Sequence, residues 1–261
     1  MTVDRPYTVA FSVYYSIYFC TAVIAQVVLL VLLKTATPKN MMKMRSFLIV
    51  SSLGHVFVCT VAFLTQARTL NTPNTLALLC NGACKYFSPE LCFVNYGLQL
   101  SMSNFVGLVN IHMMYYRYVL LDFSKESFRW VAGFSAIYLS PAFILVILFF
   151  PPPDFEVVRE ETYRLHPEYD LSVYEKFPGF SNSHHPNRNL VNFVLAAESV
   201  ILPIRAGFWM RSAVSKLNPL SRRTQMQMKS FIRGLTIQIL TPLIFYATSG
   251  SSHLVSKYAG L

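Results

Sequence analysis

Few side chains in this sequence of 261 residues stand where they could do chemistry. Glu198 and Arg205 interrupt a segment that is otherwise apolar and uncharged. Seven residues apart on a helix, they would share one face and lie about 10 Å apart along the axis. An ionisable side chain in such a segment must face protein or a water-filled cavity. Glu198 is therefore a candidate to contact a ligand, although a structural hydrogen bond is the simpler interpretation.

The histidines do not form a metal-binding or catalytic pattern. His55 and His112 are each alone on a predicted helix, and His184 and His185 lie in a polar loop where we expect them to be solvated. Metal sites on helices need clustered ligands, such as two histidines one turn apart. The sequence also has no Gly-x-Ser-x-Gly motif and no phosphate-binding glycine loop. We therefore expect no enzyme, no metal and no cofactor.

Three cysteines, at positions 80, 84 and 92, fall around the loop before the third long uncharged segment and at the start of that segment. If this region is outside the cell, an oxidising environment permits one disulfide and leaves one thiol free. We favour Cys84–Cys92, because Cys92 begins a predicted helix and Pro89 helps to turn the loop back. The sequence alone leaves the other pairings with Cys80 open.

The elements that must position these residues are long segments without charge. Each has more than the roughly 20 residues that a helix needs to cross a bilayer. Asn189–Met210 is a sixth such segment apart from Glu198 and Arg205. The five uncharged segments are Pro6–Leu33, Ser46–Ala67, Leu91–Tyr116, Trp130–Pro153 and Gly234–Ser256.

These segments predict an all-α, polytopic transmembrane helix bundle with six spans. Only 13% of the residues are charged, about half the usual soluble content of roughly 25%. We expect one transmembrane domain over 1–261, with 154–188 as a long extracellular loop. The expected helices lie near 9–33, 46–67, 91–117, 129–151, 189–215 and 221–248.

The charges between the spans predict the orientation of the chain. Alternate loops are rich in Lys and Arg and carry only two acids, Asp122 and Glu126, whereas the other loops carry seven bases and nine acids. Short basic loops stay in the cytosol, so we expect the N-terminus and 154–188 to be extracellular. This topology and the anionic inner leaflet explain the net charge of +10, so we expect no nucleic-acid partner. The tail 248–261 looks like the approach to a seventh span, and we expect a chain truncated before it.

Four blocks of sequence carry a family resemblance. They are PKNMMKMRS at 38–46, NTLALLCNGACKYFSPELC at 74–92, YYRYVL at 115–120 and LSRRTQMQMKSFIRGLTIQILTPLIF at 220–245. With these blocks the chain resembles the nematode serpentine chemoreceptors, and most of all their class delta. That family consists of seven-helix G-protein-coupled receptors.

The resemblance implies a plasma-membrane receptor, in the cilium of a sensory neuron, for a small-molecule odorant or pheromone. It also implies that Arg117 acts at the cytoplasmic end of the third helix, where engagement of a heterotrimeric G protein is controlled. Arg222 and Arg223 lie in a basic inner loop that suits an acidic cytosolic partner. Attraction to membrane lipid explains this loop equally well, and Arg117 could be a membrane anchor only.

We expect a ligand cavity in the outer halves of the third, fifth and sixth spans. Its candidate lining residues are Tyr96, Gln99, Ser103 and Glu198, which are polar at depths where exposure to lipid is costly. Gln238 and Pro242 in the sixth span are the candidate hinge, since proline removes a helical hydrogen bond. A transporter or channel subunit is the alternative, but we find no internal repeat or series of intramembrane charges that would favour it.

Overall fold

The computed structural model describes residues 4–36, 42–122, 136–150, 152–167, 169–174, 176–182 and 185–215. The chain divides into two compact units. Unit 1 comprises Met1–Val106 with Ser140–Val191, and unit 2 comprises Gly107–Leu139 with Asn192–Leu261.

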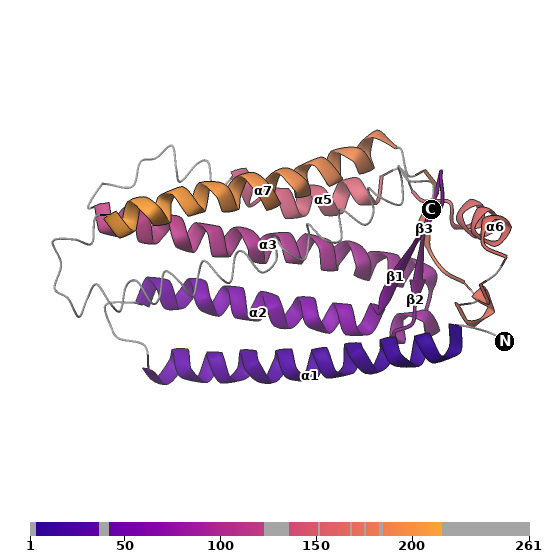
Figure 1. The fold of residues 1–261 in the computed structure, drawn as a ribbon, viewed down its shortest axis with the longest axis horizontal. Coiled ribbons are helices and arrows are strands. Elements are labelled where there is room, and N and C mark those ends of the chain that lie inside the picture. Colours follow the sequence, from indigo (N-terminus) through magenta and orange to yellow (C-terminus); the bar gives the residue numbers. More distant parts are fainter. Residues whose placement is uncertain are drawn as a thin grey trace. The chain divides into compact units, whose positions relative to one another are not determined.

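The long helices follow the uncharged segments. They are α1 (Asp4–Ala36), α2 (Met42–Thr65), α3 (Pro89–Asp122), α5 (Ser140–Leu148) and α7 (Pro186–Ser215) (Figure 1). All but α5 match the expected helices to within a few residues. The sixth expected helix, 221–248, lies outside the described residues.

Two helices among the described residues are long and apolar enough to cross a membrane. These segments are Thr8–Thr35 in α1 and Arg45–Thr65 in α2. Most of the α1 segment is not covered by protein, and apolar side chains such as Val9, Ile24 and Val31 are more than half exposed. Such a surface suits lipid rather than water.

The fourth expected helix is interrupted within its described part. We expected a helix over 129–151. Residues 136–137 are helical, Tyr138 and Leu139 form a turn, and α5 begins at Ser140, while 129–135 lie outside the described residues. Pro141 explains the break, because proline has no N–H to donate to the carbonyl of Ile137, four residues earlier. The carbonyl of Pro141 accepts a hydrogen bond from Ser101 Oγ on α3 at 2.7 Å.

A three-stranded antiparallel sheet corrects the all-α prediction. The chain is mostly helical, but β1 (Ala67–Asn71) pairs with β2 (Leu76–Cys80), and β2 pairs with β3 (Gly179–Phe180). We missed the sheet because β2, LALLC, is a short apolar run without the alternation of a half-exposed strand. The strands lie between the helices along the chain.

Strand β2 is buried on both faces, which explains its continuous apolar sequence. On one face Leu76, Leu78 and Cys80 pack with Phe93 of α3. On the other face Ala77 and Leu79 pack against a second cluster. Its remaining buried members are Val158, Leu171, Tyr174 and Phe177. The sheet is therefore the middle layer of a cap built from sequence-distant segments.

The outer layer of this cap comes from the segment 154–188. It contains α6 (Phe155–Leu165) and the short helix η3 (Leu171–Tyr174). Asp154 caps α6, accepting hydrogen bonds from the backbone N–H groups of Glu156 and Val157. One face of α6 buries Val158 and Thr162, while its charged residues lie on the rest of the helix.

A disulfide ties the sheet to the start of α3. It joins Cys84, in the short helix η2 (Ala83–Tyr86), to Cys92 with an S–S distance of 2.05 Å. This is the pair that we favoured from the sequence. Cys80 remains a free, buried thiol.

In unit 2 an aromatic cluster surrounds part of α3. Tyr115 is buried against Tyr138 and Trp209, with its ring 5.0 Å from that of Trp209. His112 Nδ1 lies 3.0 Å from the hydroxyl of Tyr138. His112 is therefore alone on its helix but has a partner across the unit.

Candidate ligand pocket

The ends of several helices in unit 1 gather beside the sheet. The end of α2 runs directly into β1, and the side chain of Asn81, after β2, donates to the carbonyl of Thr8 in α1. The disulfide brings in the start of α3, and the side chain of Asn187 in α7 donates to the carbonyl of Phe150 after α5 at 2.8 Å. The helices therefore alternate in direction within this unit.

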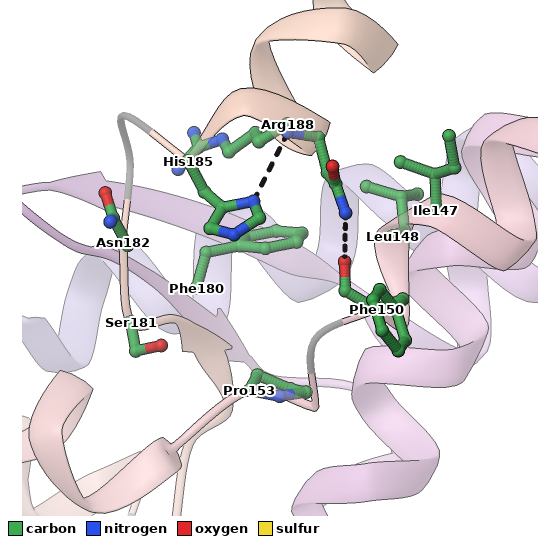
Figure 2. Close-up of a pocket in the computed structure, with 10 residues that line it drawn as sticks. Ile147, Leu148, Phe150, Pro153, Phe180, Ser181, Asn182, His185 and Arg188 are labelled. Atoms are coloured by element: carbon green, nitrogen blue, oxygen red, sulfur yellow. Dashed lines mark hydrogen bonds between the residues drawn. The ribbon is translucent and has the colours of Figure 1, made fainter.

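A cavity of about 50 Å³ opens at this end of unit 1. By the same measure a single water needs roughly 10–15 Å³, so the cavity can hold a group of several atoms. The lining residues come from the end of α5 and the residues after it, from β3 and the residues after it, and from the start of α7 (Figure 2). They are Ile147, Leu148, Phe150, Pro153, Phe180, Ser181, Asn182, His185, Asn187 and Arg188.

The start of α7 presents the polar side of this pocket. Pro186 is the first helical residue, a position where its missing N–H costs nothing. His185 caps the helix, because its Nδ1 accepts from the N–H of Asn187 at 3.2 Å and its carbonyl accepts from the N–H of Asn189. In a neutral imidazole the Nε2 then carries the proton and is a donor.

Arg188 is the charged residue among those that line the pocket. Its guanidinium lies 4.9 Å from the centre of the Phe180 ring, a distance typical of a cation–π contact. Burial lowers the pKa of Arg188, while the nearby Tyr96 acts to raise it. The Nη1 atom is buried and has no hydrogen-bond partner among the described residues.

Three of the predicted ligand residues lie on α3 in unit 1. Tyr96, Gln99 and Ser103 are each half-buried, and their spacing places them on one face of the helix. Tyr96 packs against the cluster beneath β2 and interacts with Arg188. It does not line the pocket but lies next to the side chain that does.

The fourth predicted ligand residue, Glu198, belongs to α7 in unit 2. It is half-buried, and its Oε2 atom is buried without a hydrogen-bond partner among the described residues. Arg205, seven residues on, is exposed. Neither residue has an ion pair with a described residue.

The residues expected to act on the cytosolic side are described only in part. Arg117 lies within α3, but its side chain is outside the described set. The remaining four, Arg222, Arg223, Gln238 and Pro242, lie beyond the last described residue, Ser215.

Sequence reasoning missed Arg188 and misread His185. We counted Arg188 as one more charge of the long loop and expected His185 to be solvated, yet both line the pocket. The available signal was local: His185–Pro186 begins a helix, and Arg188 lies in its first turn. What could not be read locally is that β3 and the end of α5 lie opposite this turn.

The family model of the serpentine type 7TM GPCR chemoreceptor Srd matches residues 11–260. The chain belongs to this family. The resemblance drawn from the four sequence blocks is thus confirmed, over nearly the whole chain. Members of the Srd family are seven-helix receptors rather than enzymes, so this chain is an integral membrane protein of the chemoreceptor class.

Curated relatives from Caenorhabditis elegans share the class delta name. The chain is 32% identical to serpentine receptor class delta-63 over 231 residues, covering 86% of this chain and 72% of that protein. It is 30% identical to class delta-59 over 248 residues, covering 93% of this chain and 76% of that protein. No solved structure is significantly similar to the chain.

Membership of the Srd family decides between the two function classes that the sequence left open, a chemosensory receptor and a transporter or channel subunit. A chemoreceptor of the G-protein-coupled type is favoured, and a transporter or channel subunit is not. The family also implies, in general terms, a small-molecule ligand and a G-protein partner.

Proposed function

We propose that this chain is the sensing part of a plasma-membrane chemoreceptor for a small external molecule. Its match to the Srd family over residues 11–260 carries this proposal. In it, six spans of the chain cross the plasma membrane of a sensory neuron, in its cilium, with the N-terminus and 154–188 outside. Ligand binding biases the helix bundle between two states, and a heterotrimeric G protein reads the state inside.

In this proposal the ligand contacts the polar face of α3 and the carboxylate of Glu198. Tyr96, Gln99 and Ser103 share a helical face and are only half-buried. The Oε2 atom of Glu198 is buried without a partner among the described residues, and a hydrogen-bond donor on a ligand would stabilise it. Movement of the sixth span about Gln238 and Pro242 would then transmit the change.

Arg117, Arg222 and Arg223 form the proposed contact with the G protein. All three are basic and lie at the cytosolic ends of predicted spans. A cluster of cations there can engage an acidic surface, and the proposal assigns Arg117 the controlling position in the third helix.

The proposal is tested in cells that report calcium through a promiscuous G protein. The full chain is expressed alone and as a chimera extended by the last helix of a class delta relative, and small volatile and polar molecules are screened. Arg117→Ala should abolish the response at normal surface expression, while Arg129→Ala, another inner-loop base, should change it less than threefold. An unchanged response in Arg117→Ala would show that Arg117 does not control coupling to the G protein.

Glu198→Gln and Gln99→Ala test the ligand contacts in the same cells. Each should shift the half-maximal ligand concentration upward by tenfold or more, because each removes a hydrogen bond made in a low-dielectric site. Ser101→Ala is the matched control, since Ser101 is hydrogen-bonded to the Pro141 carbonyl rather than available to a ligand. If both site variants respond like the wild type, the cavity lies elsewhere.

A further inference from the structure

We propose that the pocket at the start of α7 binds a small carboxylate with a short apolar chain, and that Arg188 pairs with the carboxylate. This pocket does not include the ligand contacts proposed above, so the inference goes beyond the proposed function and rests on it only for its biological meaning. The binding itself can be tested without any signal.

The first argument is the unmet hydrogen-bonding capacity of Arg188. Arginine stays charged in proteins and presents five donors, so a buried guanidinium nitrogen without an acceptor is costly. Its Nη1 is in this state, and no described residue forms an ion pair with Arg188. A planar carboxylate would supply two acceptors in the geometry that guanidinium favours.

The second argument is the charge of the surroundings. Among the described residues that line the pocket none is acidic, so no internal carboxylate competes for Arg188. The first turn of α7 adds the positive end of the helix dipole. His185 can add a donor at Nε2, because its Nδ1 is occupied by the N–H of Asn187.

The third argument is the division of the pocket into two sides. Ile147, Leu148, Phe150 and Pro153 are apolar and line the side that faces the end of α5 (Figure 2). The side that faces α7 carries Arg188 and His185. A neutral odorant would fill the apolar side but leave the guanidinium unpaired, whereas a short-chain carboxylate would satisfy both sides.

The segment around this anion site carries more acidic than basic residues. The segment 154–188 contains seven Asp and Glu residues but four Lys and Arg residues. Such an acidic surface repels anions in general, so retention of a carboxylate must come from the local geometry at Arg188 rather than from the overall field.

The experiment measures binding of hexanoate to the purified full chain in nanodiscs of zwitterionic phosphatidylcholine, by calorimetry. Hexanol and hexylamine have the same chain length and serve as neutral and cationic probes. We expect saturable hexanoate binding, hexanol binding at least tenfold weaker and no hexylamine binding. Equal binding of hexanoate and hexanol would overturn the proposal.

Variants locate the site. Arg188→Gln should weaken hexanoate binding at least tenfold, and Arg188→Lys should bind in between, since lysine keeps the charge but loses the planar pair of donors. Arg159→Gln is the matched control, because Arg159 lies on α6 outside the pocket and pairs with the exposed Glu156. Ser181→Leu should also block binding, by filling the cavity while Arg188 remains. Wild-type affinity in both Arg188→Gln and Ser181→Leu would overturn the proposal.

Two further measurements separate a diffusible ligand from a lipid headgroup, and this site from the receptor function. Nanodiscs that contain anionic phosphatidylserine test whether a lipid headgroup occupies the site: loss of hexanoate binding there, restored in phosphatidylcholine, would replace the diffusible ligand by a lipid and overturn the proposal as stated. In reporter cells, hexanoate binding without a response would count against the receptor function alone. A ligand response that is indifferent to Arg188→Gln would count against this site alone.

Discussion

The surroundings of Cys80 make its thiol unreactive. The sulfur atoms of Cys80, Cys84 and Cys92 lie within 4.8 Å of one another, a grouping that in other settings holds a metal ion. Here Cys84 and Cys92 form a disulfide, and the thiol of Cys80 is buried against Leu78, whose carbonyl its sulfur contacts at 3.7 Å. Burial raises the pKa of Cys80 to about 12. Since the thiolate is the reactive form, proximity to the disulfide does not make Cys80 reactive.

We therefore predict that Cys80 resists alkylation in the folded protein. At pH 8 a thiol with a pKa near 12 is ionised to roughly 1 part in 10,000, whereas an ordinary thiol with a pKa of about 8.5 is roughly one quarter ionised. Reactivity should rise only as the pH approaches 12 or when the protein unfolds. Mass spectrometry after a short maleimide pulse measures this.

The control for this prediction is an introduced cysteine on the exposed side of α6, Glu160→Cys. It should be labelled at least 100-fold faster than Cys80 at pH 8. Equal labelling rates in the native protein would mean that Cys80 is not buried as described.

At the scale of elements, the two-residue strand β3 connects the cap to the pocket. Gly179 pairs with Ala77 of β2, and the next residue, Phe180, contributes both to the pocket and to the contact with Arg188. A Cβ atom at Gly179 would lie 2.3 Å from the carbonyl oxygen of Leu76 and 2.7 Å from Val158. Only glycine lets the strand approach this closely, so the position of Phe180 depends on Gly179.

We predict that Gly179→Ala destabilises the cap by about 1–3 kcal/mol, the usual range for overpacking, because the backbone of β2 cannot move away. Gly107→Ala is the control, since it is an exposed position in α3 with nothing within 4 Å of the added Cβ. That change should be neutral or stabilise by up to about 1 kcal/mol, as glycine is a poor helix former. Thermal unfolding in detergent measures both, and Gly179→Ala as stable as the wild type would contradict the packing described.

At the scale of the whole molecule, the segments expected outside the cell belong together. The region near Thr8, the loop around Asn81 and the segment 154–188 all contribute to the same end of unit 1. Because successive spans alternate in direction, the loops that join them lie at alternate ends. If the basic loops lie together on the cytosolic side, these segments must lie together on the opposite side. The fold of unit 1 shows that these segments share one end, and the prediction that this end lies outside the cell rests on the charge pattern alone.

We predict that epitope tags at residue 2 and near residue 170 label intact cells, and that a tag near residue 218 labels only permeabilised cells. The physical reason is the excess of Lys and Arg in the alternate loops, which resist translocation. Flow cytometry before and after permeabilisation measures it, with a cytosolic protein as the control. Labelling of the tag near 218 on intact cells would reverse the topology.

The sequence by itself determined the class of the protein and the approximate positions of α1, α2, α3 and α7. Segments such as Pro6–Leu33 indicate that the chain lies in lipid, because a helix without any charge over about 20 residues is favourable only where lipid replaces water. The family could likewise be identified from local blocks such as 74–92. These properties need no knowledge of which segments meet.

Only the tertiary structure decided the cap and the pocket. Strand β2 is apolar at every position, so its sequence could not tell a buried strand from a helical turn until its two neighbours were known. The pocket joins residues at and after the end of α5 with residues of 180–182 and the start of α7. The guanidinium of Arg188 lies against the ring of Phe180, a contact that the residues beside Arg188 in the chain do not predict. Burial and the loss of partners are properties of packing, and packing between distant segments is what a reading of local patterns does not contain.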